Sequence, residues 1–350
     1  MNNPVSPMSA HGTSVISAQV KAQPEHFIVR EWLGFAPDNE GDHMLVKVRK
    51  RGANTMWVAK QLAKFANVDA RDVGFAGLKD RHAVTEQSFT VPSRLLAPEA
   101  WLQVSGDGFQ VIEATKHKRK LKRGAHKGNE FEITLTNVIG DPDVLVKRLE
   151  VIKSLGVPNY FGAQRFGHDG NNLRMAMEWF EGGQAILDRH QRGFALSAAR
   201  SMLFNAILQA RVDQGTWNQL LSGDMANLNG SNSVFAVDEV DEVLKQRCGE
   251  FDIHPTGAMW GTGELLTKGA VKELELRIAE AHEIVTRGLC SAGLEQERRA
   301  LRVHARNFTW ELAGDQLTLG FGLTKGAFAT VVIAELIGAT ASALAEGEDG

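Results

Sequence analysis

The segment Gly74–Gln87 carries the side chains best suited to chemistry. Its apolar, glycine-containing run ends in Lys79, Asp80, Arg81 and His82. Glycine permits a tight backbone that a substrate can approach closely, and the neighbouring positive charges favour an ionised Asp80. An ionised carboxylate in a pocket is a competent nucleophile toward an electrophilic carbon. The alternative is a surface turn in which Asp80 pairs with Arg81 or with backbone N–H groups.

The common cofactor and metal motifs are absent from the sequence. Gly320–Gly326 has glycines and a lysine, but not in the order of a phosphate-binding loop, and no GxGxxG or GxSxG stands in the chain. His282–Glu283 lacks the second histidine of HExxH, and no histidine pairs with Cys248 or Cys290 at a metal-ligand spacing. We therefore expect a site that needs no metal and no cofactor.

Two basic clusters lie in the first half of the chain. The longer one contains Lys116, Lys118, Arg119, Lys120, Lys122, Arg123 and Lys127, and the shorter one contains Lys47, Arg49, Lys50 and Arg51. Like charges repel, so such runs usually serve a polyanion, whose counterions are released on binding. The alternative is a solvated loop. Two runs in one half of the chain favour RNA or DNA.

The overall composition is that of an ordinary globular protein. The 350 residues carry a net charge of −3, whereas residues 1–150 hold 21 Lys and Arg against 17 Asp and Glu. Two cysteines exclude a disulfide scaffold. No apolar run approaches the roughly 20 residues that span a bilayer, and the N-terminus lacks the pattern of a secretory signal. These features predict a soluble, cytoplasmic protein that does not contact a membrane.

Periodicity places these segments on regular elements. Asn54 and Thr55 predict the start of a helix that runs to about Ala66, and Asp141-Pro142 opens another that Gly156 ends. A further helix is expected to end at Gly288. Alternation predicts strands at 44–49 and 131–138, and strands return from Arg306. Strand-rich ends around a helical middle suggest one domain inserted in another.

Five motifs, in order along the chain, resemble those of the TruD family of tRNA pseudouridine synthases. They are KRGANT at 50–55, GLKDRHAVTEQ at 77–87, NYFGAQRFG at 159–167, HPTGAMWG at 254–261 and FATVV at 328–332. Ala258 stands where the family usually has proline. The resemblance extends over nearly the whole chain, from residue 24 to residue 336.

The resemblance implies an α+β fold. It consists of a pseudouridine-synthase catalytic domain with a mixed, largely antiparallel sheet and flanking helices, plus an inserted, mostly helical α/β TruD-specific domain. The catalytic domain is expected at 15–157 and 304–340, and the inserted domain at 158–303. Residues 1–14 are expected to be disordered and the acidic tail, 341–350, to fray.

The resemblance also implies the reaction and its residues. The partner is tRNA, the target is uridine 13 and Asp80 matches the catalytic aspartate. Phe131 takes the place of the aromatic that stacks on the base, Asn129 is placed to hydrogen-bond it, and Phe27 and Phe328 match other substrate contacts. We expect Lys21 or Lys79 to pair with Asp80 and the two basic clusters to contact the tRNA backbone. A protein partner is not expected, so the protein is predicted to be a monomer.

Three chemical routes stay open for Asp80: attack on C1′ of the ribose, removal of the C2′ proton, or addition to C6 of the base. Two other functions compete with this prediction. A non-catalytic tRNA-binding module or RNA chaperone would explain the basic clusters. A carboxylate-dependent glycosidase would need a second acid as its general acid–base.

Overall fold

The computed structural model describes residues 9–93 and 95–338, and the chain divides into two compact units. We call the first the sheet unit, which consists of Ala18–Ile139 and Arg306–Gly326. The second, the helical unit, contains the described residues up to Ser17, residues 140–305 and the segment that begins at Ala327.

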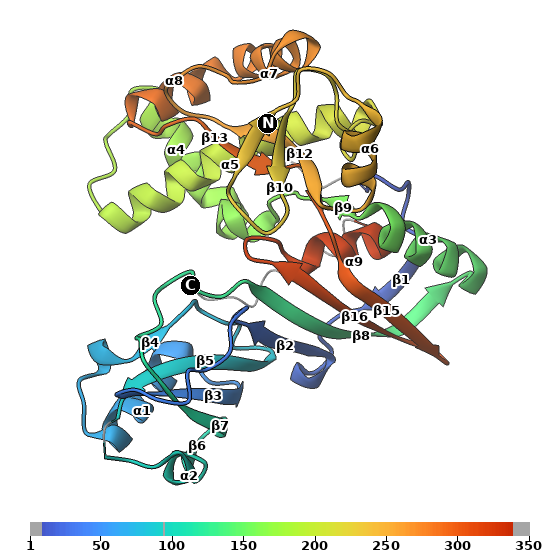
Figure 1. Ribbon diagram of the computed structural model, residues 1–350. Helices are drawn as coiled ribbons and strands as arrows, with labels where there is room; N and C mark the ends of the chain where they lie inside the picture. Colours follow the sequence, from blue (N-terminus) through green and yellow to red (C-terminus); the bar gives the residue numbers. More distant parts are fainter. Residues whose placement is uncertain (1–8, 94, 339–350) are drawn as a thin grey trace. The chain divides into compact units, whose positions relative to one another are not determined.

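The sheet unit is built on one large mixed sheet (Figure 1). Its strands are β1 (Ile16–Gln19), β2 (Phe27–Trp32), β3 (His43–Arg51), β4 (Gly74–Phe75), β5 (Val84–Pro92), β6 (Ser105–Gly106), β7 (Phe109–His117), β8 (Gly128–Gly140), β15 (Arg306–Ala313) and β16 (Gln316–Thr324). They follow the order β15-β16-β8-β2-β5-β3-β7-β6, with β1 on β8 and β4 on β5. Strands β2 and β5 are parallel, whereas β3 is antiparallel to both β5 and β7, and β8 to both β2 and β16. The predicted mixed, largely antiparallel sheet is therefore present.

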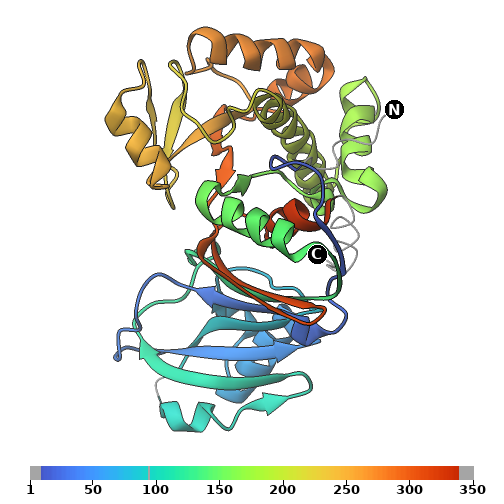
Figure 2. The ribbon, with the colours of Figure 1, turned by 90° about the vertical axis from the view of Figure 1, so that its right-hand side faces the viewer.

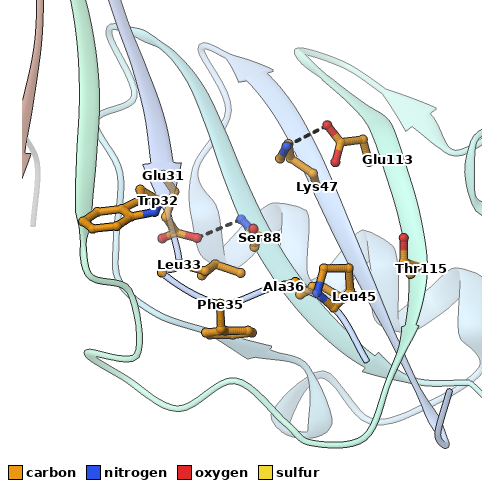
Figure 3. A pocket seen from close by; sticks show the side chains of 12 residues that line it. Glu31, Trp32, Leu33, Phe35, Ala36, Leu45, Lys47, Ser88, Glu113 and Thr115 are labelled. Atoms are coloured by element: carbon orange, nitrogen blue, oxygen red, sulfur yellow. Dashed lines mark hydrogen bonds and ion pairs between the residues drawn. The ribbon is translucent and has the colours of Figure 1, made fainter. Parts of the chain in front are cut away.

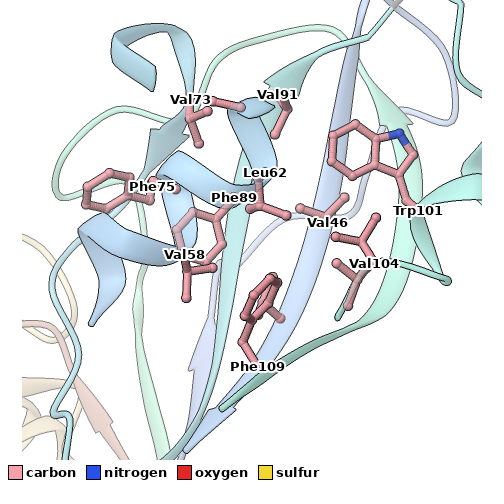
Figure 4. Packing of buried hydrophobic residues seen from close by; sticks show 14 of the residues in the cluster. Val46, Val58, Leu62, Val73, Phe75, Phe89, Val91, Trp101, Val104 and Phe109 are labelled. Carbon is pink, nitrogen blue, oxygen red and sulfur yellow. The ribbon is translucent and has the colours of Figure 1, made fainter. Parts of the chain in front are cut away.

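Helix α1 (Thr55–Ala66) covers one face of this sheet, where a hydrophobic core forms (Figure 4). It begins where the sequence predicts, because the Asn54 side chain accepts a hydrogen bond from the Met56 amide. Its Val58 and Leu62 pack in one cluster with Val46 and Phe89 of the strands. Shorter helical segments are α2 (Pro98–Trp101), η1 (Pro24–His26) and η2 (Ala70–Asp72).

Alternation along β3 decides which side chains face the core. Val46 and Val48 are fully buried in the α1 cluster. Their neighbours Leu45 and Lys47 point to the opposite face, since successive strand residues alternate. The sheet unit therefore has one face covered by α1 and another on which Lys47 and Arg49 form ion pairs with Glu113 and Glu86.

The helical unit contains a smaller sheet flanked by helices (Figure 2). Its helices are α3 (Pro142–Leu155), α4 (Asn171–Phe180), α5 (Arg189–Asp213), α6 (Glu242–Gly249), α7 (Gly269–Ala281), α8 (Glu283–Ser291) and α9 (Ala329–Ile337). Its strands are β9 (Val157–Pro158), β10 (Met225–Leu228), β11 (Val234–Ala236), β12 (Ile253–Met259), β13 (Glu297–Ala300) and β14 (Arg302–Val303). Strands β11-β10-β12-β13 form one sheet and β14-β9 another, and 3-10 turns lie at Ala163–Phe166 and His168–Gly170.

Helix α3 begins and ends where the sequence predicts, whereas α8 corrects the predicted helix end at Gly288. Asp141 caps α3 by accepting from two backbone amides, and Gly156 ends it with a positive φ of 75°. Gly288, in contrast, lies inside α8 instead of ending a helix. A Cβ there would come within 2.2 Å of the Phe180 ring. The glycine is needed for close packing against α4 and not for a turn.

The N-terminal segment, for which the sequence predicted disorder, makes hydrogen bonds in the part that the structure describes. The Ala10 amide donates to Glu335 Oε1 at 3.0 Å, and His11 Nε2 lies 2.8 Å from the Gly156 carbonyl oxygen. Residues 9–14 are therefore held by hydrogen bonds. Residues 1–8 and the predicted frayed tail, 341–350, lie outside the described residues. The domain bounds 15–157 with 304–340, and 158–303, stay a prediction. Among the described residues, the chain passes from one compact unit to the other after Ser17, Ile139, Ala305 and Gly326.

Candidate active site

Asp80 lies in the loop between β4 and β5, and both of its carboxylate oxygens are engaged. Lys21 Nζ lies 2.6 Å from Oδ2, and the His82 amide donates to Oδ1 at 2.7 Å. The Asp80 side chain is 4% exposed and that of Lys21 is 15% exposed. Arg81 does not pair with Asp80 but donates to the Gly52 carbonyl. The sequence left Lys21 and Lys79 open as charge partners, and in this geometry Lys21 makes the ion pair.

The backbone of Lys21 is held in an uncommon conformation. Its φ is +51°, in the left-handed region that few residues other than glycine adopt. Its ammonium lies 4.4 Å from the centroid of the Phe27 ring as well as on Asp80. An outlier of this kind persists only where the surroundings fix it, and such outliers gather at functional sites.

Lys50 anchors the backbone beneath Asp80. Its side chain is buried, and Nζ donates to the carbonyl oxygens of Ala53, Lys79 and Asp80 at 3.1, 3.2 and 3.1 Å. Three acceptors match the three N–H donors of an ammonium. Burial lowers the pKa of Lys50 to about 8, and this effect outweighs the opposing attraction of Asp80.

Lys79 joins the Asp80 loop to the end of the central strands. Its Nζ lies 2.5 Å from Asn129 Oδ1 on β8 and 3.4 Å from Glu31 Oε1 on β2. The side chains of Lys79 and Glu31 are 7% and 1% exposed. Burial lowers the pKa of Lys79 and raises that of Glu31, and in each case the partner's charge opposes the shift. The Ser88 amide also donates to Glu31 Oε2, at 3.0 Å.

This contact determines how the Asn129 amide is turned. An ammonium can only donate hydrogen bonds, so the oxygen of the amide must face Lys79. The Nδ2 group is therefore directed away from Lys79, where its two N–H bonds are available to another acceptor. The network gives Asn129 the character of a hydrogen-bond donor toward any bound molecule.

A row of aromatic rings lies beside this network. Strand pairing places Val29 opposite Phe131 and Phe131 opposite Phe321. The Phe131 ring stacks on Phe321 at 5.5 Å and meets the edge of Phe27 at 6.2 Å. Phe27 and Phe131 are both buried. The structure thus brings Asp80, Lys21, Lys79, Asn129, Phe27 and Phe131 into one connected set.

Two uncharged side chains hold the loop against α1 and β5. Thr55 Oγ1 accepts from the Lys79 amide at 3.3 Å and donates to Gln87 Oε1 at 3.1 Å. Gln87 Nε2 in turn donates to the Gly77 carbonyl at 2.5 Å. The loop carrying Asp80 is consequently tied to two regular elements.

The predicted tRNA-contacting residues differ in how they are placed. Those of the longer cluster are exposed apart from the half-buried Lys116: Lys118, Arg119, Lys120, Lys122, Arg123 and Lys127. Some are already engaged, since Lys118 pairs with Glu40 at 2.6 Å and the Arg123 guanidinium lies over the Phe75 ring. In the shorter cluster, Lys47, Arg49 and Arg51 pair with Glu113, Glu86 and Glu25.

One residue of the shorter cluster does not suit the role predicted for it. Lys50 is 1% exposed and directs its ammonium to three carbonyl oxygens. Alternation along β3 explains this, because Lys50 shares the core face with Val46 and Val48 whereas Lys47 and Arg49 face the other way. The prediction that Lys50 contacts the tRNA backbone is therefore corrected: it supports the Asp80 loop.

Glu31 and Phe321 are members of this site that the sequence analysis did not identify. Period-two spacing contains a signal for Glu31, because Phe27, Val29 and Glu31 fall on one face of β2. A glutamate at the third of these positions implies a buried cation as its partner. Phe321 follows from the pairing of β16 with β8, a long-range register that the local sequence does not specify.

Phe328 and two of the motifs belong to the helical unit. Phe328 is half-buried at the N-cap of α9. In the NYFGAQRFG motif, Asn159 Oδ1 accepts from Arg299 at 2.7 Å, and the Phe161 amide donates to Asn205. Burial lowers the pKa of Arg299 to about 9, and nearby Arg165 adds to the effect. In the HPTGAMWG motif, the Ala258 amide donates to Glu275 on α7. These contacts organise the helical unit internally.

The described residues contain no group of three or more His, Cys, Asp or Glu side chains that is placed to hold a metal ion. Among the same residues, no helix is both long enough and apolar enough to span a membrane.

Comparisons with known proteins agree on one family. The family model described as "tRNA pseudouridine synthase D (TruD)" matches residues 8–176 and 170–336. The tRNA pseudouridine synthase D of Aeromonas salmonicida is 45% identical over 327 residues, which cover 93% of this chain and 92% of that protein. That of Xanthomonas campestris pv. campestris is 44% identical over 352 residues, covering 96% and 95%.

A solved structure is similar in fold. It is a crystal structure described as a tRNA pseudouridine synthase D (TruD) from Methanosarcina mazei, with a TM-score of 0.74 and 18% identity. The match covers 95% of this chain and 96% of the other. The similarity confirms the fold class that the sequence predicts.

Proposed function

Because this chain belongs to the tRNA pseudouridine synthase D (TruD) family, we propose that it isomerises uridine 13 of tRNA to pseudouridine with Asp80 as the catalytic carboxylate. The observation that supports this proposal is the fixed position of the Asp80 carboxylate. Lys21 holds one of its oxygens and the His82 amide holds the other. Lys50 holds the same loop in place, because its ammonium donates to the backbone carbonyl oxygens of Lys79 and Asp80. These contacts fix the position of the Asp80 carboxylate before a substrate binds. A reaction at one particular atom of the substrate requires a charged group whose position is fixed in this way.

The isomerisation exchanges one bond to the ribose for another. The bond between C1′ and N1 of uracil breaks, and a bond between C1′ and C5 forms. The hydrogen on C5 leaves to water and N1 gains a proton, so the atoms and electrons balance without an oxidant or a hydrolytic water. Asp80 takes part by bonding to C1′, by removing the C2′ proton or by adding to C6.

The base has to leave the folded RNA before it can meet Asp80. We assign its recognition to Asn129, whose Nδ2 is turned outward by Lys79 and suits a uracil carbonyl oxygen. Phe131 supplies the stacking ring, supported by Phe321 and Phe27. Phe328 is assigned as a further contact by family resemblance.

Lys21 governs access to the carboxylate. The Asp80 side chain is only 4% exposed, and the Lys21 ammonium lies on its Oδ2 atom. A ribose that reacts with Asp80 has to approach beside Lys21 or displace it. The left-handed backbone of Lys21 then serves to place this ammonium, not merely to close a turn.

Tritium release from tRNA labelled at C5 of uridine tests the proposal. Wild-type protein should release tritium to water, and Asp80→Asn should abolish release while tRNA binding stays nearly intact. Pseudouridine should map to position 13. If neither wild type nor Asp80→Asn releases tritium, the proposed enzymatic activity is contradicted. A non-catalytic tRNA-binding module or RNA chaperone is then favoured.

Release of free uracil would identify a glycosidase instead. Such an enzyme needs a second carboxylic acid near the sugar. Glu31 is the other carboxylate of this network, but it is ion-paired with Lys79, accepts a hydrogen bond from the Ser88 amide and is 1% exposed. Its contacts suit the support of Lys79 and not proton transfer to a leaving base.

A further inference from the structure

The exposed face of α1 carries positive charge and no negative charge. The helix contains Lys60 and Lys64 but neither an aspartate nor a glutamate, and both lysines are exposed. In the part of the chain that the structure describes, neither ammonium forms an ion pair. Two lysines four residues apart lie on the same side of a helix and repel each other. Without an anion, this face is therefore slightly destabilised by its own charge.

The helix itself accounts for only one of these two charges. Lys64 lies in the last turn, where the helix dipole stabilises a cation. Lys60 lies in the middle of the helix, beyond the range of that effect. A helix face that meets only solvent typically alternates the sign of its charges. The pair of lysines is thus typical of a face that meets an anionic partner.

The longer basic cluster lies against both ends of this helix. The Arg123 guanidinium lies 4.0 Å from the centroid of the Phe75 ring, and its Nη2 lies 3.9 Å from Met56 Sδ in the first turn of α1. Lys120 Nζ donates to the carbonyl oxygen of Arg71, in η2 beyond the last turn, at 2.7 Å. Because Lys120 and Arg123 are also exposed, the cluster and the α1 lysines form one positive surface.

This surface begins beside the loop that carries Asp80. Thr55, the first residue of α1, accepts a hydrogen bond from the Lys79 amide at 3.3 Å. The exposed Arg81 donates to the carbonyl oxygen of Gly52, three residues before the helix. The first turn of α1 is therefore fixed next to Asp80, and the helix leads away from it.

Strand register places the assigned base site on the same side of the sheet. Residues paired across adjacent strands share one face. From β8 through β2 and β5 to β3, one such row consists of Phe131, Val29, Thr85 and Lys50. Lys50 shares the α1 face with Val46, so Phe131 lies on that face too. An RNA strand that delivers a base to Phe131 has to approach on the side that α1 covers.

The opposite face of the sheet is less suited to a polyanion. A pocket of about 530 Å³ opens there, and Figure 3 shows Lys47 of β3 held by Glu113 of β7, with 2.6 Å between Nζ and Oε1. Arg49 on the same face pairs with Glu86 at 2.8 Å. A phosphate would have to displace a carboxylate from each of these cations, whereas the α1 lysines can accept a phosphate directly.

An anionic membrane is the other polyanion that a basic helix can meet, and α1 does not suit it. A helix that lies on a membrane inserts its apolar face into the lipid. In α1 that face, with Val58 and Leu62, is buried in the core of the sheet unit. The exposed Trp57 ring meets the edge of Phe109 at 5.5 Å, so it is also held by the protein.

We propose that Lys60 and Lys64 bind neighbouring phosphates of the substrate tRNA, so that α1 extends the basic surface of residues 116–127 away from Asp80. The inference rests on the proposed function for the identity of the RNA. Residues four apart on a helix have Cβ atoms roughly 6 Å apart, and the two long side chains can therefore reach adjacent phosphates of one strand. Such contacts position the RNA without reading its sequence.

Removing both charges tests the proposal. In Lys60→Gln with Lys64→Gln, glutamine keeps the helix propensity, so the melting temperature should change little. Affinity for the substrate tRNA should fall roughly 10-fold, and the slope of log K against log salt should decrease in magnitude by roughly 1.5 to 2. The matched control is Lys147→Gln with Lys153→Gln, which removes the same charge from exposed positions of α3 and should leave the slope unchanged.

Substrate tRNAs that each carry one neutral methylphosphonate linkage locate the contact. One linkage or two adjacent linkages should weaken binding to wild type and have no further effect on the Lys60/Lys64 variant. Equal losses with both proteins at every linkage would overturn the proposal, as would a salt slope in the variant equal to that of wild type. Loss of binding to phosphatidylserine vesicles in the variant, with unchanged tRNA affinity, would overturn it in favour of a membrane.

The measurement separates this proposal from the chemistry assigned to Asp80. Binding and its salt dependence are measured without turnover, so a failure of the chemistry would appear only as a lack of tritium release by wild type. At saturating tRNA, the single-turnover rate of the Lys60/Lys64 variant should equal that of wild type, because neither lysine meets the base.

Discussion

At the scale of single residues, hydrogen-bond polarity decides what Asn129 can do. Lys79 occupies its oxygen at 2.5 Å, which leaves the two N–H donors for a ligand. Uracil presents carbonyl oxygens at O2 and O4, whereas cytosine presents an amino group in place of O4. A donor fixed by a buried lysine therefore favours uracil over cytosine if it contacts O4.

Replacing Asn129 by aspartate isolates this donor. Asn129→Asp keeps the size of the side chain and still accepts from Lys79, but it has no N–H group. We expect kcat/KM to fall on the order of 10²-fold, since a buried acceptor of the base is left unpaired, while the melting temperature is maintained. Steady-state kinetics and thermal unfolding of the same preparation check both results. A variant with wild-type kcat/KM would remove Asn129 from base recognition.

Lys50 makes activity and stability depend on pH in opposite directions. Its pKa is lowered from 10.5 to about 8, so above pH 8 the folded protein loses a proton that the unfolded chain keeps up to about 10.5. Its contribution to stability accordingly rises through that interval, because the unfolded state binds more protons there. The neutral amine, however, has one donor fewer for the carbonyls of Lys79 and Asp80.

We therefore expect the rate of pseudouridine formation to decline above about pH 8 as the Asp80 loop loses a hydrogen bond. Lys50→Met should be less active at neutral pH and should lack this decline. Single-turnover rates between pH 6.5 and 9.5 measure the difference, with tRNA saturating. If the pH–rate profiles of wild type and Lys50→Met run parallel, a group other than Lys50 causes the decline in rate at high pH.

At the scale of elements, the loop that carries Asp80 depends on how α1 and β5 meet. Thr55 is the first residue of α1 and bonds both Lys79 and Gln87, while Gln87 on β5 bonds Gly77. A substitution of Thr55 should therefore loosen the loop that carries Asp80, even though Thr55 does not contact Asp80.

Thr55→Val keeps the shape of the side chain and removes its hydroxyl. The Lys79 amide and Gln87 Oε1 then lose their partner, which should lower the free energy of unfolding by about 1–3 kcal/mol. Thr55→Ser keeps the hydroxyl and should stay within about 1 kcal/mol of wild type. Urea unfolding of the three proteins measures the order, and equal losses in the valine and serine variants would point to packing instead of hydrogen bonding.

Local patterns predicted the elements whose ends are set by nearby residues. The caps of α1 and α3 follow from Asn54, Asp141 and Gly156 because each acts within a few residues of itself. Gly288 was misassigned because its contact is Phe180, which is distant in sequence. The same limit applies to the site: Asp80 stands in a recognisable motif, but Glu31, Phe321 and the burial of Lys50 depend on strand pairing.

At the scale of the whole molecule, charge is distributed unevenly along a chain whose net charge is only −3. The predicted tRNA-contacting lysines and arginines all lie in the sheet unit, which also holds Asp80. In the shorter cluster, Lys47, Arg49 and Arg51 are paired with carboxylates, so their net attraction for phosphate is reduced. The exposed longer cluster should therefore dominate the salt dependence of tRNA binding.

Reversing two charges of that cluster measures its share. In Arg119→Glu with Lys122→Glu, loss of about two phosphate contacts should weaken tRNA binding and reduce the slope of log K against log salt by roughly 1.5 to 2. Lys245→Glu with Arg287→Glu changes the net charge equally on exposed helices of the helical unit, where both side chains are paired locally. If the two double variants flatten the slope to the same extent, net charge and not this cluster governs the attraction. A smaller slope for the first variant alone assigns phosphate contacts to the segment that leads into Asn129, and would place tRNA docking and base recognition on the same continuous stretch of chain.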